Sequence, residues 1–166
     1  VAEVGGFRGN FAFMINICFK DRKLYLFDTF EGFAKHEEKH DLEKDYIDNK
    51  FFSKYDFKRT NIDIVMEKMM YKENCIVKKG GVPKTAVGLD EQFAFVSIDV
   101  DLFLPTLNAL EYFYPRLSQG GFIFLHDYNN NEIFGVKKAV VEYERKYERL
   151  KKVPISDGGG TLVIAK

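Results

Sequence analysis

Apolar and polar positions along the chain follow two alternating periods, which predicts strands interleaved with helices. Short apolar runs typical of buried strands occupy residues 1–4, 23–28, 75–79, 93–99 and 121–125. Between these runs, apolar side chains recur every three or four residues, as on one face of a helix. The expected helical stripes are Phe11/Met14/Ile15/Cys18, Ile62/Val65/Met66/Met69, Leu107/Leu110/Tyr114/Leu117 and Val136/Val140/Tyr143/Tyr147/Leu150. The alternation predicts an α/β fold, an open and mostly parallel sheet with helices on both faces.

Several residues suit the ends of these predicted helices. Asn61 or Thr60 is placed to cap the helix that follows it. Pro105 is expected to open the next helix, because its fixed φ suits a first turn. The pair Gly120-Gly121 is expected to end that helix and to begin the following strand.

The C-terminal region carries two further apolar runs, near residues 153–155 and 161–165. Asp157-Gly-Gly-Gly160 lies between them and predicts a tight hairpin, so the seventh strand should be antiparallel. Residues 30–59 are instead polar and Phe-rich without a clean period, which predicts a lid or an insertion. The length favours one domain over residues 1–166. Because the chain opens directly on an apolar strand, we expect N-terminal elements of this domain to be missing.

Composition narrows the classes of function. Lys plus Arg equal Asp plus Glu at 25 each, whereas nucleic-acid-binding domains usually carry a basic excess. The basic stretch at 135–152 interleaves Glu with Lys and Arg, which predicts a solvated outer helix. No apolar run approaches the roughly 18 residues of a membrane span. Cys18 and Cys75 lack zinc-site spacing and indicate the reduced thiols of a cytoplasmic protein. We expect neither a nucleic acid nor a membrane as partner.

The stretch HEEKH at residues 36–40 fits a pattern in which two His one helical turn apart bind zinc and the Glu acts as a base. A zinc-binding helix needs an apolar side and a third ligand downstream. Charged residues flank HEEKH, and the one other His of the chain is His126. We therefore predict a charged turn of helix in the lid, where His36 or His40 could touch a substrate.

A glycine-rich turn, Glu3-Val-Gly5-Gly6-Phe7-Arg8-Gly9, follows the first predicted strand. A dinucleotide fingerprint that starts at Gly5 needs Gly at positions 7 and 10, which are Phe and Asn here. The turn fits E-x-G-x-x-x-G better, the first motif of many S-adenosylmethionine (SAM) methyltransferases. Glycines there let the backbone approach a ligand. Asp28, at the end of the second strand, can accept two ribose hydroxyls, in a SAM site or an NAD site.

Acidic residues follow two of the predicted strands. Asp99 and Asp101 come after the fourth strand, and His126-Asp127 after the fifth. The carboxyl ends of parallel strands lie at one edge of the sheet, so these side chains should converge. Carboxylates suit Mg²⁺ or a similar cation better than zinc. A bound cation lowers the pKa of a coordinated hydroxyl, and His126 or a carboxylate such as Asp101 could take the proton.

Several long stretches of the chain resemble the macrocin O-methyltransferase (TylF-like) family. They are VAEVGGFRGNFA, KLYLFDTFEGF, FAFVSIDVDLFLPTLNALEYFYPRLSQGGFIFLHDYNN and GVKKAV, in the family's order. The resemblance implies a Rossmann-like Class I fold with a seven-stranded sheet and a SAM- and metal-dependent enzyme that methylates sugar hydroxyls on natural products. It implies SAM contacts at Glu3, Gly5, Gly9, Asp28 and Phe30, to which we add Gly6 and Asp99 at the same strand ends. It implies metal or catalytic roles for Asp99, Asp101 and Asp127.

One departure concerns the metal, because family members often carry two adjacent acids where this chain has His126-Asp127. We expect SAM and Mg²⁺ as cofactors, a small-molecule hydroxyl acceptor, and a homo-oligomer as one possible assembly. Two alternatives stay open. One is an NAD(P)-linked oxidoreductase on a similar sheet, and the other is a non-catalytic binding domain with the same fold.

Overall fold

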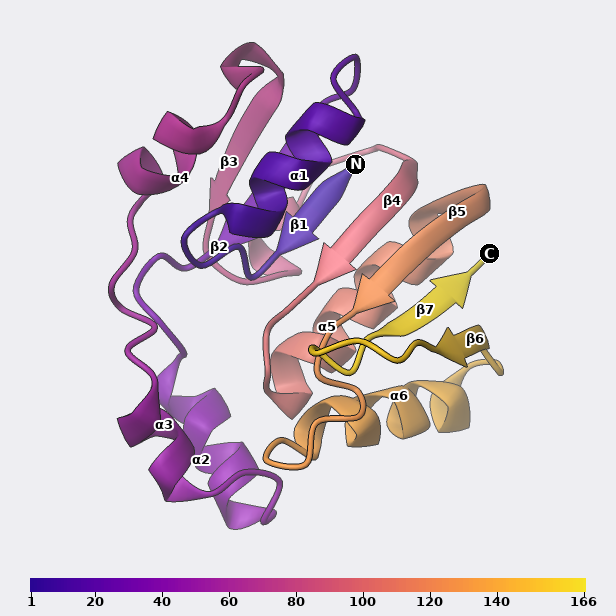
Figure 1. Cartoon of the computed structure of the whole chain (residues 1–166). Coiled ribbons are helices and arrows are strands. Elements are labelled where there is room, and N and C mark those ends of the chain that lie inside the picture. The colour runs from indigo at the N-terminus through magenta and orange to yellow at the C-terminus, as the bar shows by residue number, and fades with distance from the viewer.

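A computed structural model describes residues 1–166 and shows one seven-stranded sheet (Figure 1). The strands are β1 (Ala2–Val4), β2 (Leu24–Asp28), β3 (Cys75–Lys79), β4 (Phe93–Ile98), β5 (Leu117–Leu125), β6 (Lys151–Pro154) and β7 (Leu162–Ala165). Their order in the sheet is β3-β2-β1-β4-β5-β7-β6. Every neighbouring pair is parallel except those of β7, which runs antiparallel to both β5 and β6. The predicted fold class is confirmed.

Helices cover the sheet unequally. The helices are α1 (Asn10–Cys18), α2 (Lys35–Glu43), α3 (Asn49–Lys54), α4 (Ile62–Lys68), α5 (Phe103–Phe113) and α6 (Gly135–Lys146), with 3₁₀ turns at Lys72–Asn74, Lys84–Ala86 and Tyr114–Arg116. Figure 1 shows α1 on one face of the sheet and α5 with α6 on the other. The α5–α6 face holds the larger core, and α1 and α4 close a smaller one around Ile15, Leu26 and Val65. None of the helices has both the length and the apolar character that crossing a membrane requires.

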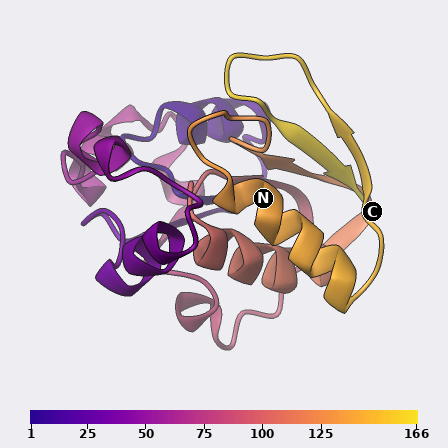
Figure 2. The ribbon, with the colours of Figure 1, turned by 90° about the horizontal axis from the view of Figure 1, so that it is seen from below.

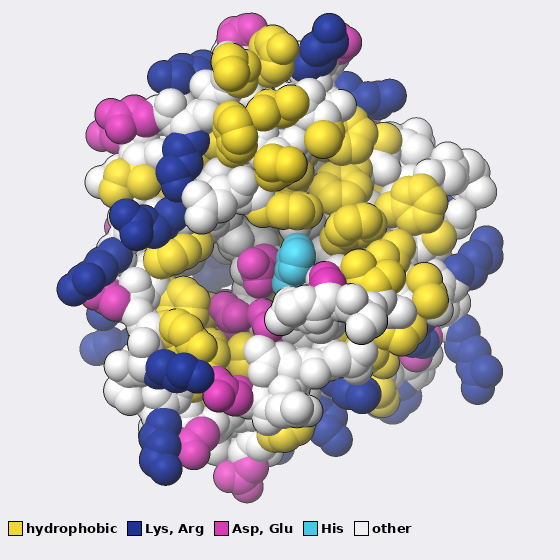
Figure 3. Space-filling model, viewed as in Figure 1, with side chains coloured by type: hydrophobic (Ala, Val, Ile, Leu, Met, Phe, Trp, Pro, Cys, Tyr) yellow, Lys and Arg dark blue, Asp and Glu magenta, His cyan; other side chains and the backbone are white.

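The α1 face of the sheet is open over β5 and its neighbours. Phe122 and Phe124 of β5 project on this face, and Phe122 keeps 44% of its surface exposed. Met14 and Ile17 of α1 are exposed beside it. Figure 3 shows the resulting spread of hydrophobic side chains, which borders a hollow lined with acidic groups.

The predicted boundary between the third helical stripe and the fifth strand is wrong. We expected a helix from Pro105 to Gly120-Gly121, but α5 already begins at Phe103 and ends at Phe113. Pro115 lies in the 3₁₀ turn that follows, and it lacks the N–H that a continuing helix needs. The glycine pair instead lies inside β5, where the register with β4 shifts. A side chain at Gly121 would come within 3.1 Å of the Ala94 carbonyl oxygen, so the strands can meet there only without one.

The structure shows which residue caps α4, where α6 ends and how β6 connects to β7. Asn61 caps α4 by accepting a hydrogen bond from the Ile64 amide at 2.8 Å, whereas Thr60 donates its hydroxyl to the Phe7 carbonyl. Helix α6 ends at Lys146, before Leu150. β6 and β7 form the predicted antiparallel hairpin. The Gly160 amide donates to the Asp157 carbonyl oxygen at 3.4 Å, so Asp157–Gly160 turns the chain within a longer connection, residues 155–161.

The segment 30–59 contains two helices, α2 and α3, although its sequence predicted no regular period. Figure 1 shows both helices beyond the carboxyl ends of the strands, and Figure 2 shows α2 beside α5. A β-bridge joins Ile47 to Ile133, and the Phe134 amide donates to the Tyr46 carbonyl oxygen at 2.7 Å. The segment therefore docks on the start of α6, and we call it the lid.

Candidate active site

A cavity of about 520 Å³ lies at the carboxyl ends of the strands, within the size range of small-molecule sites. The strand order reverses between β1 and β4, the position at which open α/β sheets bind ligands. The loops after β1, β2, β3, β4 and β5 line the cavity, and the lid closes one side. Its main polar and aromatic lining residues are Asp28, His36, Glu37, Lys84, Asp99, Asp101, Asn108, Asp127, Asn130, Glu132, Phe7, Phe33, Phe51, Tyr55 and Phe57.

Three carboxylates converge in this cavity, as the sequence predicted. One oxygen each of Asp99, Asp101 and Asp127 can be chosen so that all three lie within 4.8 Å of one another. Asp101 and Asp127 both have positive φ, 58° and 59°, which few residues other than glycine adopt. The loops after β4 and β5 thus each bend sharply at one aspartate, and the two carboxylates lie close together.

The loop that carries Asp127 is held from two sides. The Asp127 amide donates to the Gly159 carbonyl oxygen at 2.9 Å, so the β6–β7 loop fixes its backbone. The Asn130 side-chain amide donates to Asp127 Oδ1 at 2.7 Å and fixes its carboxylate. The glycines of the β6–β7 loop thus support the site in addition to turning the chain between β6 and β7.

Burial and neighbouring charges raise the pKa values of two acids of the cluster, Asp99 and Asp101. Burial raises the pKa of Asp99 to about 6, with the His126 charge opposing and the Asp127 charge adding to the shift. The Asp99 side chain is exposed to solvent only within the cavity that it lines, and protein atoms surround it on its other sides. Burial raises the pKa of Asp101 further, with the charges of Asp99 and Asp127 acting in the same direction. A divalent cation would remove the repulsion, and three carboxylates are oxygen ligands that suit Mg²⁺. The residues present therefore fit such an ion.

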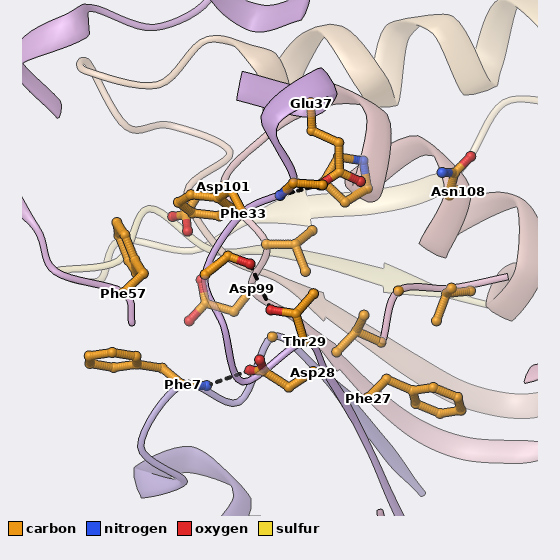
Figure 4. Close-up of a pocket in the computed structure, with 18 of the residues that line it drawn as sticks. Phe7, Phe27, Asp28, Thr29, Phe33, Glu37, Phe57, Asp99, Asp101 and Asn108 are labelled. Carbon is orange, nitrogen blue, oxygen red and sulfur yellow. Dashed lines mark hydrogen bonds between the residues drawn. The ribbon is translucent and has the colours of Figure 1, made fainter. Parts of the chain in front are cut away.

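Asp28 marks the other part of the cavity. Its Oδ2 accepts a hydrogen bond from the Phe7 amide at 2.9 Å (Figure 4). Its Oδ1 accepts one from the Phe30 amide at 2.6 Å. Burial raises its pKa, and these backbone hydrogen bonds oppose the shift. Each carboxylate oxygen can accept a second hydrogen bond. Asp28 is thus held in place with acceptor capacity free for two hydroxyls of a ligand.

Glu3 lies beneath the glycine-rich turn and not in the cavity wall. It is 2% exposed, and its Oε2 has no hydrogen-bond partner. Burial raises its pKa well above the usual range, and the charges of Asp99 and Asp28 add to the shift. Gly6 lies directly over this carboxyl group. An unpartnered buried oxygen next to the turn is the kind of group that a bound cationic ligand satisfies.

Gly5 is required by the protein's own packing. Its φ is 82°, and a Cβ there would come 1.9 Å from the Asp99 carbonyl oxygen. This contact keeps the turn after β1 against the start of the acidic loop after β4. We predicted from the sequence that Gly5 contacts a ligand, and Gly5 does line the cavity. The neighbour that leaves no room for a side chain at Gly5, however, is the Asp99 backbone.

Aromatic rings of the lid wall the cavity near the acids. The Phe57 ring lies 4.7 Å from that of Phe33 and 5.9 Å from that of Phe7, between ring centroids. Figure 4 shows Phe7 and Phe57 on one side of Asp28 and Asp99, with Asn108 at the opposite end. These rings form an apolar wall of the cavity beside the carboxylates.

The predicted site residues divide into two groups. Gly5, Asp28, Asp99, Asp101 and Asp127 line the cavity, whereas Glu3, Gly6, Gly9, Phe30 and His126 do not.

His126 does not line the cavity, and two neighbours hold its ring. Its Nδ1 lies 3.3 Å from Thr161 Oγ1, and its ring packs edge-on against Phe11 at 5.3 Å between centroids. Its charge still acts on Asp99. Its role as a base stays a prediction, and Asp101 is the better-placed candidate.

The HEEKH stretch lies in α2, as predicted, and no third metal ligand joins it. Sequence reasoning missed the residue that follows it. Asp41 is fully buried; its Oδ2 accepts a hydrogen bond from the Phe103 amide at 2.8 Å, and its Oδ1 lies 2.8 Å from His40 Nδ1. It thereby caps α5 from the lid. In the sequence, Asp41 is one acid among charged neighbours, and nothing there distinguishes a buried acid from a solvent-exposed one.

The strand order, the antiparallel β7 and the acid-lined cavity at the switch point define the class, a Rossmann-like SAM methyltransferase fold. Solved structures agree: the chain aligns over its full length with 71% of the O-methyltransferase NovP at TM-score 0.74 and 19% identity. It also aligns with 71% of the calicheamicin methyltransferase CalS11, over 99% of the chain, at TM-score 0.68 and 17% identity.

Sequence comparison specifies the family. The chain is 36% identical over 71 residues to 8-demethyl-8-(2,3-dimethoxy-alpha-L-rhamnosyl)-tetracenomycin-C 4'-O-methyltransferase from Streptomyces olivaceus. That match spans 43% of this chain and 26% of that enzyme. Residues 1–158 match the model of the Macrocin-O-methyltransferase (TylF) family, and the chain belongs to that family. The predicted family is therefore confirmed.

Proposed function

We propose that the protein is a SAM-dependent O-methyltransferase that methylates a sugar hydroxyl of a small molecule with the help of a divalent cation. The observation that carries this proposal is that Asp28 and the acidic cluster open into one cavity. One group is suited to a ribose and the other to a cation and a reacting hydroxyl. The tetracenomycin relative is named for methylation of a rhamnosyl 4′ hydroxyl, which supports a sugar as acceptor.

The residues around Asp28 serve to bind and orient the methyl donor. Asp28 accepts hydrogen bonds from the two ribose hydroxyls, and backbone amides keep its carboxylate in place. The buried Glu3 carboxyl below the turn favours a cationic group above it. The rings of Phe7 and Phe57 cover the transfer region and exclude water. Most of the rate enhancement would come from this alignment of donor and acceptor.

The acidic cluster serves the acceptor. Asp99, Asp101 and Asp127 would hold Mg²⁺, which when bound lowers the pKa of a nearby acceptor hydroxyl. Asp101, whose carboxylate lies in the same cluster, is our candidate to take the proton of that hydroxyl. Asn130 keeps the Asp127 carboxylate directed into the cluster.

Calorimetric titration with S-adenosylhomocysteine, with and without Mg²⁺ and with NADH as a control ligand, tests the proposal. We expect micromolar binding of S-adenosylhomocysteine and no binding of NADH. Asp127→Ala should abolish the Mg²⁺ response and leave S-adenosylhomocysteine binding within about threefold, and Asp90→Ala, an exposed position before β4, should change neither. Binding of NADH in place of S-adenosylhomocysteine would point to the oxidoreductase, and an unchanged Mg²⁺ response in Asp127→Ala would refute the cation site.

A further inference from the structure

A second cavity, of about 740 Å³, adjoins the first beyond the acidic cluster. It lies between the loop after β5 and the β6–β7 loop, with the end of α3 beside it. We call it the polar basin, and its lining is Lys54, Tyr55, Asn129, Asn130, Asn131, Glu132, Pro154, Ile155, Ser156, Asp157, Gly158, Gly159 and Gly160. Tyr55, Asn130 and Glu132 line both cavities. A ligand whose hydroxyl reaches Asp127 can therefore extend into the basin.

The basin offers neutral hydrogen-bonding groups that the protein does not use. The side chains of Asn129, Asn131 and Ser156 are exposed and make no hydrogen bond within the chain. Asn130 differs, because it donates to Asp127 and accepts from the Glu132 amide at 2.8 Å. A side-chain amide offers two donors and an acceptor, which suits the paired hydroxyls of a sugar.

The charges of the basin disfavour an anion. Its one cation, Lys54, is paired with Glu132, whose two oxygens lie 3.0 and 3.1 Å from Nζ. Asp157 adds a second carboxylate, which accepts a hydrogen bond from the Thr161 amide at 2.8 Å. A phosphate group is normally held by free Arg or Lys side chains, by a cluster of backbone amides or by a metal ion. The basin lining presents no unpaired cation to a phosphate.

We propose that the polar basin is the subsite for the uncharged, hydroxyl-rich arm of the acceptor, so that the protein takes neutral glycosides and discriminates against nucleoside-diphosphate sugars. The inference rests on the proposed function for the identity of the neighbouring site. It assigns Asn129, Asn131 and the carboxylates of Glu132 and Asp157 a role in specificity and not in the transfer itself.

The test uses pairs of ligands that share a sugar and differ in charge, p-nitrophenyl glucoside against uridine diphosphate glucose and the corresponding galactosides. Binding is followed by ¹⁵N NMR of the side-chain amides of Asn129 and Asn131 and of the backbone amides of Gly158–Gly160. Without added divalent cation, at low ionic strength, we expect the neutral glycosides to shift these signals and to bind at least tenfold more tightly than the nucleotide sugars.

Charge variants at Asn131 sharpen the test, because its side chain makes no contact whose loss would confuse the result. Asn131→Lys should tighten nucleotide-sugar binding by about three- to tenfold at low ionic strength, with the effect lost near 0.5 M salt. Asn131→Asp should weaken it. With either variant, any loss of neutral-glycoside binding from the missing amide should be the same at low and at high ionic strength. Asp90→Lys, at a remote exposed position, adds two units of positive charge, twice the change of Asn131→Lys, and it should still have little effect.

The outcomes separate this inference from the proposed function. Tighter binding of the nucleotide sugars by the unaltered protein, binding of neither ligand at millimolar concentrations, or equal responses to Asn131→Lys and Asp90→Lys would overturn the subsite. The NMR shifts do not require the methyl donor. A protein that fails to bind S-adenosylhomocysteine but shifts the Asn129 and Asn131 signals with neutral glycosides would refute the methyltransferase and retain the subsite.

Discussion

Asp41 is the residue whose removal tests how the lid is attached. Its fully buried carboxylate makes two contacts, a hydrogen bond from the Phe103 amide at the start of α5 and a contact with His40, both at 2.8 Å. Loss of a helix cap costs about 0.5–2 kcal/mol. Loss of a second hydrogen bond to a charged group costs about 1.5–3 kcal/mol. Because both contacts belong to one carboxylate, the two costs add only in part, and Asp41→Ala should lower the free energy of unfolding by about 2–4 kcal/mol.

Thermal unfolding followed by circular dichroism measures this change. In a chain of this size each kcal/mol lowers Tm by about 2–4 °C, so Asp41→Ala should lower Tm by about 5–15 °C. Asp41→Asn should lose less, because an amide oxygen can still accept from the Phe103 amide. Glu43→Ala, on the exposed side of the same helix with a 3.6 Å pair to Lys39, is the matched control and should stay within about 2 °C. A Tm for Asp41→Ala within the range of this control would refute the capping role.

Three further predictions concern the cavity. Asp28→Ala should weaken S-adenosylhomocysteine binding about tenfold or more in calorimetry, because two hydroxyls lose a charged acceptor; an unchanged Kd would exclude the ribose contact. Gly5→Ala should lower the free energy of unfolding by about 2 kcal/mol or more, from strain at φ 82° and the 1.9 Å approach to the Asp99 carbonyl oxygen, whereas Gly158→Ala, with open space around its Cβ, should stay near the unaltered protein in urea unfolding. Because the pKa of Asp101 is raised in the folded protein, the native state holds the proton longer than the unfolded one. The stability of the metal-free protein therefore falls as pH rises above the unfolded value near 3.8, and Asp101→Asn should raise Tm at pH 7 by at least about 2 °C; a lower Tm would contradict this sign.

The sequence predicted the fold because its periods are strong where the sheet is buried. β2 and β4 read as continuous apolar runs, and their strand ends brought Asp28 and Asp99 to the expected edge. The errors fall where one local signal competes with another. Gly120-Gly121 has the composition of a helix stop, but Pro115 had already ended α5, and the pair serves a register shift between β4 and β5. Periodicity alone does not decide between those two uses of glycine.

The lid was predictable as a segment but not as a structure. Its helices are short and mostly polar, and α3 buries only Phe51. Their stability depends on tertiary contacts such as the β-bridge between Ile47 and Ile133 and the capping of α5 by Asp41, which join residues far apart in the sequence. The polar basin was missed for the same reason, since it forms only where the loops after β5 and β6 meet.

The turns that surround the cavity hold most of the residues with a strained backbone conformation. Five residues other than glycine have positive φ, and four of them, Phe7, Phe30, Asp101 and Asp127, belong to the turns that surround the cavity. Such conformations persist only where neighbouring contacts impose them. Here the contacts are the Asp28 carboxylate, which accepts from the Phe7 and Phe30 amides, and the Gly159 carbonyl oxygen, which holds Asp127.

The same groups thus position the backbone and present acceptors to ligands. A substitution at Asp28 removes a hydroxyl acceptor and also releases two strained turns. Its effect on S-adenosylhomocysteine binding should therefore exceed that of losing the hydroxyl contacts alone. A separate effect on unfolding should accompany it, because both amides lose their partner. Asp28→Asn keeps an acceptor oxygen for one of these two amides, whereas Asp28→Ala keeps none. If binding falls equally in both variants while the alanine variant loses more stability than the asparagine variant, the carboxylate charge acts on the ligand and the oxygen geometry acts on the fold.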